Sequence, residues 1–147
     1  MRRLVLIACL AALTAAALTS TANEALIAGI GDQNSDTFSK PNFTKLKVKR
    51  TRLIVPYDAV LHEPGAGRLK QWMDAVKKAK LKPLVAFNPT GGSRCPAKPC
   101  SIPSAKAYTK AFKAFRKKYP FVKEFNFWNE TNSATQPTGS TKSSTLK

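Results

Sequence analysis

Phe125-Asn126-Phe127-Trp128-Asn129-Glu130 is an aromatic-rich run that ends in an amide and a carboxylate. Its phenylalanines alternate with Asn126 and Trp128, and this period of two predicts a strand with one apolar and one mixed face. Glu130 then lies at the carboxyl end of the strand. In α/β proteins that end is where side chains leave the packed sheet and reach a ligand, so Glu130 is a candidate for general acid/base chemistry. A strand that simply stops at a solvated glutamate fits these six residues equally well.

Three further apolar runs precede this one, at residues 25–31, 49–56 and 84–88, and amphipathic helical patterns separate them at residues 38–46, 68–81 and 104–119. Strands that alternate with helices form βαβ units and hence a parallel sheet with right-handed crossovers. A doubly wound sheet would normally show a glycine fingerprint after its first strand, and Gly29-x-Gly31 lacks the third glycine. The pattern therefore favours a (β/α)8 barrel, in which the chemistry lies at the carboxyl ends of the strands.

Polar residues stand at or near these strand ends. Asp32 opens a stretch spaced like a calcium loop, but Thr37 and Phe43 occupy the places of its glycine and distal glutamate, so we predict a polar rim and no metal site. Arg52 lies inside the second predicted strand. A buried arginine needs a carboxylate or several acceptors, which indicates a polar sheet interior containing an acid; an arginine on an exposed edge is the alternative. The only histidine, His62, excludes a multi-histidine metal site.

Four motifs together resemble the first half of a TIM-barrel glycoside hydrolase of the retaining superfamily called clan A. They are Gly31-Asp32-Gln33 after strand one, Arg52 on strand two, Phe87-Asn88-Pro89 ending strand three, and Trp128-Asn129-Glu130 ending strand four. The resemblance implies that Glu130 is the general acid/base and that Asn129 binds the sugar 2-hydroxyl. We expect the remaining substrate contacts from Trp128, Asn88, Arg52, Asp32 and Tyr57. No cofactor is expected.

A retaining enzyme also needs a nucleophilic carboxylate about 5 Å from its acid. The resemblance implies that this nucleophile comes from a seventh strand, whereas the sequence contains about four βα units. We therefore expect an incomplete (β/α)8 TIM barrel, truncated before the nucleophile and of doubtful activity alone. Its open sheet edges favour self-association.

The two ends of the chain differ in composition from the centre. Residues 1–22 combine an Arg2-Arg3 start, an apolar run and a small-residue exit, which predicts a signal peptide cleaved near Ala22 and a secreted, extracellular protein. Residues 23–132 form the predicted half-barrel domain, and residues 133–147 are expected to be a disordered Ser/Thr-rich tail. In an exported chain, Cys95 and Cys100 are better explained as a disulfide than as a zinc knuckle, which would need four ligands.

Twenty-five lysines and arginines against eight acidic residues give a formal charge of +17. The basic residues fall on the presumed solvent faces of helices and are not interleaved with exposed aromatics, so no specific nucleic-acid partner is predicted. Such a charge attracts acidic polymers, including cell-wall teichoic acids and uronate-bearing glycans.

Three hypotheses follow. The chain is a glycoside hydrolase fragment acting on a carbohydrate substrate, a non-catalytic carbohydrate-binding module, or a secreted cationic protein bound to an anionic cell-wall polymer.

Overall fold

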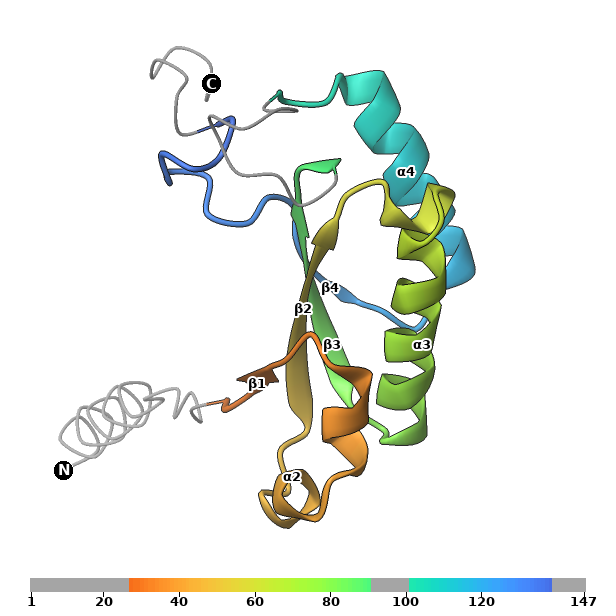
Figure 1. The fold of residues 1–147 in the computed structure, drawn as a ribbon, viewed down its shortest axis with the longest axis vertical. Coiled ribbons are helices and arrows are strands. Elements are labelled where there is room, and N and C mark those ends of the chain that lie inside the picture. The colour runs from red at the N-terminus through yellow and green to blue at the C-terminus, as the bar shows by residue number, and fades with distance from the viewer. Residues whose placement is uncertain (1–26, 91–100, 139–147) are drawn as a thin grey trace, which may run out of the picture.

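Four parallel strands form one sheet, and they lie side by side in the order in which they occur in the chain (Figure 1). The computed structural model describes residues 27–90 and 101–138. The strands are β1 (Ile30–Gly31), β2 (Arg50–Pro56), β3 (Lys82–Asn88) and β4 (Glu124–Asn126). The predicted α/β class with a parallel sheet is therefore confirmed, while closure into a barrel belongs to the proposal below.

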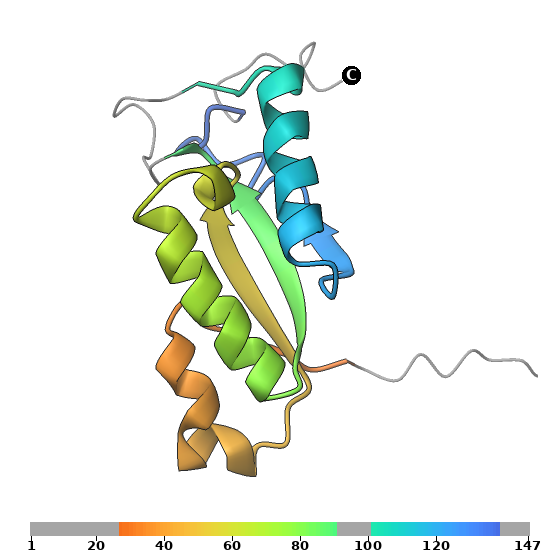
Figure 2. The same ribbon diagram turned by 90° about the vertical axis from the view of Figure 1, so that its right-hand side faces the viewer.

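Two long helices cover one face of this sheet, and shorter helices occupy the connections (Figures 1 and 2). The long helices are α3 (Gly65–Lys78) and α4 (Ala105–Lys118); the short ones are η2 (Ser35–Ser39), α2 (Pro41–Lys45) and η3 (Ala59–Leu61). Each long helix presents an apolar stripe to the strands, and the side chains most deeply buried there include Trp72, Met73 and Val76 of α3 and Phe115 of α4. Packing against the sheet stabilises helices of this length far more than their intrinsic propensity does.

The strand pattern gives the sheet two unlike faces. In β2, Thr51, Leu53 and Val55 are buried, whereas the residues between them are only half-buried. Successive side chains of a strand point to opposite faces, so the half-buried set lies on the face without helices. Arg50 and Glu124 form an ion pair, and the register places them on this same open face, on either side of β3. One face is thus an apolar core, whereas the other carries the charges of Arg50 and Glu124 beside apolar residues such as Ile54.

Several predicted boundaries differ from the observed ones. The single helix expected at residues 38–46 is two short helices, because Lys40 has extended backbone dihedrals and precedes Pro41, a position where helical geometry is disfavoured. Helix α3 starts at Gly65, three residues before the predicted start at residue 68. In its first turn, the Gly67 amide donates a hydrogen bond to the Glu63 carboxylate. The last strand ends at Asn126, so Trp128, Asn129 and Glu130 lie in the loop beyond it.

The described part of the Ser/Thr-rich tail is folded, in contrast to the prediction. Residues 133–138 form turns in which Gln136 and Pro137 are buried, and the Gln136 amide donates to the Ser133 carbonyl at 2.9 Å. The signal-peptide prediction for residues 1–22 and the disulfide prediction for Cys95 and Cys100 lie outside the described residues. Among the described helices, none is long and apolar enough to cross a membrane.

Candidate functional site

A hydrogen bond from β2 fixes the loop that follows β4. Arg52 Nη2 donates to Asn129 Oδ1 at 2.6 Å, and the Asn129 amide donates to the Phe87 carbonyl at 2.7 Å. Asn129 is only 5% exposed, so both of its contacts are largely shielded from water. Residues that are 77 positions apart in sequence are thereby joined at the carboxyl edge of the sheet. The acid that we expected beside Arg52 is instead an amide, and the acid on this face, Glu124, is bound by Arg50.

Tyr108, in the first turn of α4, fixes the same loop from the helix side. Its hydroxyl donates to the Phe127 carbonyl at 2.6 Å. Its ring stacks on Tyr57, with centroids 5.6 Å apart, and lies 6.5 Å from the ring of Trp128. Burial raises the pKa of Tyr108 to about 12, so the hydroxyl stays a donor through the neutral range. The helical pattern of residues 104–119 predicts an apolar stripe but gives no sign of this contact.

Glu130 lines an open groove of about 710 Å3 beside β4, together with Leu84, Asn126 and Trp128. Leu84 pairs in register with Arg52 and with Glu124, which places this groove against the open face of the sheet. Glu130 itself is exposed. Its backbone lies in the left-handed region, at φ 52°, and its carbonyl accepts a hydrogen bond from the Ser133 amide at 2.9 Å. At this turn the chain departs from the direction of β4, and the Glu130 side chain lines the groove.

Three buried polar atoms near this edge have no hydrogen-bond partner among the described residues. They are Arg52 Nε, Asn88 Oδ1 and Trp128 Nε1. Two are donors and one is an acceptor, and buried groups of this kind are normally satisfied by protein, water or ligand. A molecule rich in hydroxyl groups can serve all three, because each hydroxyl both donates and accepts.

The backbone amide of Asp32 donates to the Arg52 carbonyl at 3.3 Å, but the described contacts of its carboxylate stay within its own turn. Its Oδ1 accepts a hydrogen bond from the Asn34 amide at 2.7 Å, and its carbonyl accepts one from Trp72 Nε1 at 2.9 Å. The Asn34 amide, with smaller contributions from Thr37 and Lys40, lowers the pKa of Asp32. Asp32 therefore shapes the turn after β1, and its predicted role in binding substrate has no support here.

A second acidic residue, Asp58, lies at the same carboxyl edge. It is 9% exposed, and its Oδ2 accepts a hydrogen bond from Thr90 Oγ1 at 2.9 Å. This bond joins the loop after β2 to the loop after β3. The Tyr57 amide donates to the Asn88 carbonyl at 3.0 Å and extends the same connection. Tyr57 and Asn88 are thus held adjacent.

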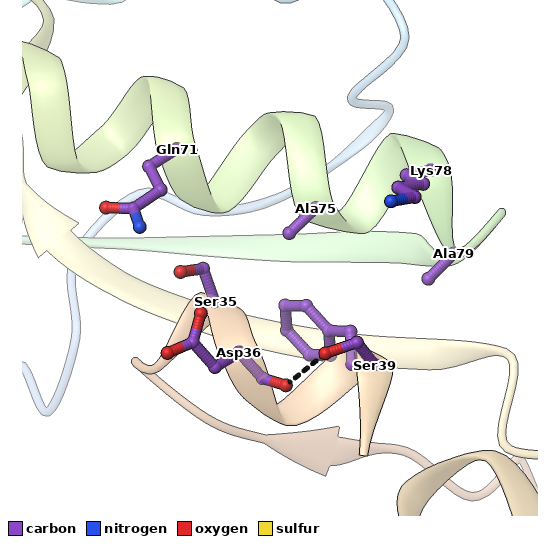
Figure 3. Close-up of a pocket in the computed structure, with 8 residues that line it drawn as sticks. Ser35, Asp36, Ser39, Gln71, Ala75, Lys78 and Ala79 are labelled. Atoms are coloured by element: carbon purple, nitrogen blue, oxygen red, sulfur yellow. Dashed lines mark hydrogen bonds between the residues drawn. The ribbon is translucent and has the colours of Figure 1, made fainter. Parts of the chain in front are cut away.

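Another hollow, of about 380 Å3, lies between η2 and α3 (Figure 3). Ser35, Asp36 and Ser39 face Gln71 and Lys78 across it, and Ser39 Oγ donates to the Asp36 carbonyl. None of the predicted site residues lines this hollow. No cluster of three or more potential metal ligands occurs within residues 27–90 and 101–138.

The candidate site thus contains Arg52, Asn88, Asn129, Trp128 and Glu130 at one edge of a parallel sheet, with Tyr57 and Tyr108 beside them. Comparisons with protein-family models, with curated proteins and with solved structures found no match. Any assignment of function to this chain therefore depends on its residues and their arrangement.

Proposed function

We propose that this chain is a secreted carbohydrate-acting protein of the retaining TIM-barrel glycoside hydrolase type, with Glu130 as its general acid/base. Residues 23–132 would form the first four βα units of the barrel, the helix-free face of the sheet being its interior. The observation that carries the proposal is the Arg52–Asn129 hydrogen bond of 2.6 Å. It places the Trp-Asn-Glu run at the carboxyl edge of strands that follow one another in barrel order.

The contacts of Asn129 support a role in sugar binding. Its Oδ1 is used by Arg52, which leaves the two N–H donors of its side-chain amide for a ligand hydroxyl. Trp128 and Tyr57 offer aromatic faces on which the apolar side of a sugar ring can stack. Together with the unpaired Asn88 Oδ1 and Arg52 Nε, they make a set of donors, acceptors and faces suited to a carbohydrate.

In the proposed chemistry, the Glu130 carboxyl protonates the bridging oxygen as the bond to the leaving sugar breaks. A second carboxylate must then attack the anomeric carbon from the opposite side. Glu130 is the only carboxylate among the described residues that line the groove. The proposal for these residues is therefore sugar binding and proton delivery, and hydrolysis requires a nucleophile supplied from elsewhere.

A panel of oligosaccharides tests this proposal, with binding followed by tryptophan fluorescence and hydrolysis by the release of reducing ends. We expect Glu130→Gln to bind as the wild type does and to lose about 10²–10⁴-fold of any hydrolysis. Trp128→Ala should weaken binding. Asp36→Asn, an exposed acid remote from the groove, is the matched control and should change neither. Hydrolysis that survives unchanged in Glu130→Gln, or binding indifferent to Trp128→Ala, would refute the assignment.

A non-catalytic carbohydrate-binding module is the second candidate, and the single carboxylate in the groove favours it. Binding that persists in Glu130→Gln, with no turnover by the wild type on any substrate, would select this alternative.

A further inference from the structure

Helix α4 carries a straight stripe of lysines on the side opposite to its core contacts. The stripe consists of Lys106, Lys110, Lys113 and Lys117. Their spacings of four, three and four residues place them on one helix face, and all four are exposed. The buried residues of the helix, Ala111 and Phe115, lie on the opposite face against the sheet. The lysine stripe therefore points away from the protein along the whole length of the helix.

This charge is not compensated within the described residues. Helix α4 contains no acidic residue, and none of the ion pairs found there uses one of its lysines. On α3, by contrast, Lys70 is paired with Asp74 one turn later, at 2.5 Å. Like charges three and four residues apart destabilise a helix, and Lys106 in the first turn also opposes the helix dipole. The repulsion between these lysines thus lowers the stability of α4. Residues that lower stability without an evident structural gain are often found at functional sites.

The stripe lies on the outer surface of the helix layer. Lys106 shares the first turn of α4 with Tyr108, but Tyr108 packs against the core and so faces away from the stripe. From Lys106 to Lys117 the helix rises about 16 Å, with roughly one positive charge per turn. An elongated anionic ligand that lies along α4 would therefore meet all four charges.

We infer that the lysine stripe of α4 docks a linear polyuronate, an acidic polysaccharide with one carboxylate on each sugar residue. Carboxylates repeated along an unbranched chain complement the positive charges repeated along the stripe, and an elongated anion can span more of these charges than a compact one. Nucleic acid is disfavoured because the aromatic side chains of α4 face the core and leave no exposed ring for base stacking. A membrane surface is disfavoured because the apolar face of α4 is already packed against the sheet.

This inference goes beyond the proposed function, because the stripe and the groove lie on opposite sides of the sheet. The two can fail separately. Docking depends on the stripe and on salt, whereas binding in the groove depends on Trp128 and is measured with short neutral oligosaccharides.

The test measures binding of the protein to polygalacturonate, with the methyl-esterified polymer as the uncharged control. Two variants each replace four exposed lysines by glutamine and so have the same net charge. One removes the stripe, Lys106, Lys110, Lys113 and Lys117; the other removes Lys45, Lys47, Lys49 and Lys82, which lie before or at the start of β2 and β3. Circular dichroism checks that both variants fold.

We expect the stripe variant to bind polygalacturonate at least tenfold more weakly than the control variant, and wild-type binding to fall steeply as salt is added. The esterified polymer should not bind. Equal losses in the two variants would mean that total charge alone drives binding and would overturn the inference. Tighter stripe-dependent binding to DNA or to anionic vesicles than to polygalacturonate would also overturn it. Trp128→Ala should bind polygalacturonate as the wild type does, because Trp128 lies in the groove and not on the lysine stripe.

Discussion

Replacing Arg52 by methionine removes the donor that holds Asn129 and keeps most of the aliphatic packing. The lost contact joins a guanidinium to a buried amide oxygen at 2.6 Å, and hydrogen bonds to charged groups contribute about 1.5–3 kcal/mol. The same replacement removes Arg52 Nε, a buried donor without a partner among residues 27–90 and 101–138, and burying such a donor costs about 1–3 kcal/mol. The two effects oppose each other, so the single variant measures only their difference.

A double-mutant cycle separates them. The free energy of unfolding is measured by urea titration for the wild type, Arg52→Met, Asn129→Ala and the double variant, followed by circular dichroism and tryptophan fluorescence. We expect a coupling energy of about 1.5–3 kcal/mol, because the penalty at Arg52 Nε appears on both sides of the cycle and cancels. At a typical urea dependence, this corresponds to a shift in the midpoint of about 1 M.

The matched control pairs Arg52→Met with Asn42→Ala, an exposed residue of α2. Distant sites should add to within about 0.5 kcal/mol. If the coupling energy between Arg52 and Asn129 were also no larger than about 0.5 kcal/mol, the claim that this bond fixes the loop carrying Glu130 would be refuted.

The other predictions concern Tyr108 and the sheet edges. Tyr108→Phe should lower the free energy of unfolding by about 1 kcal/mol because it removes the bond to the Phe127 carbonyl. Tyr119→Phe should be neutral or stabilising because the buried Tyr119 hydroxyl has no hydrogen-bond partner in the part of the chain that the structure describes. Equal losses in urea titrations of the two variants would contradict this. Since burial raises the pKa of Tyr108 to about 12, its contribution to stability should be complete below pH 10 and lost as the pH rises toward 12. Burial also raises the pKa of Tyr119, so ultraviolet titration should show two late tyrosines, of which one disappears in Tyr108→Phe. A titration unchanged by that variant would count against this prediction. The unpaired edges of β1 and β4 should make the protein self-associate with rising concentration, and sedimentation as a monomer throughout would argue against an open half-barrel.

The parallel sheet could be predicted because burial imposes a simple period on the sequence. Thr51, Leu53 and Val55 alternate with half-buried residues, and α3 and α4 repeat their apolar positions at helical spacing. These signals are local and follow from which face each element must bury.

The details of the site depend on contacts between distant residues, which local patterns do not encode. The run from Phe125 to Glu130 alternates like a strand, yet β4 ends at Asn126, and Arg52 and Tyr108 hold the residues that follow. Sequence also could not distinguish an amide from a carboxylate as the partner of Arg52. The hydrogen bond from the Asn34 amide to the Asp32 carboxylate likewise has no sign in the sequence pattern.

At Glu130, the left-handed backbone opposes stability to the proposed role of the carboxylate. For a residue with a side chain, that conformation costs roughly 1–2 kcal/mol, and glycine adopts it freely. Glycine at position 130 should therefore make the protein harder to unfold while it deletes the carboxylate. If variants of this protein were selected in the laboratory for heat resistance alone, they would be expected to discard the glutamate, and those selected for action on a sugar would be expected to keep it.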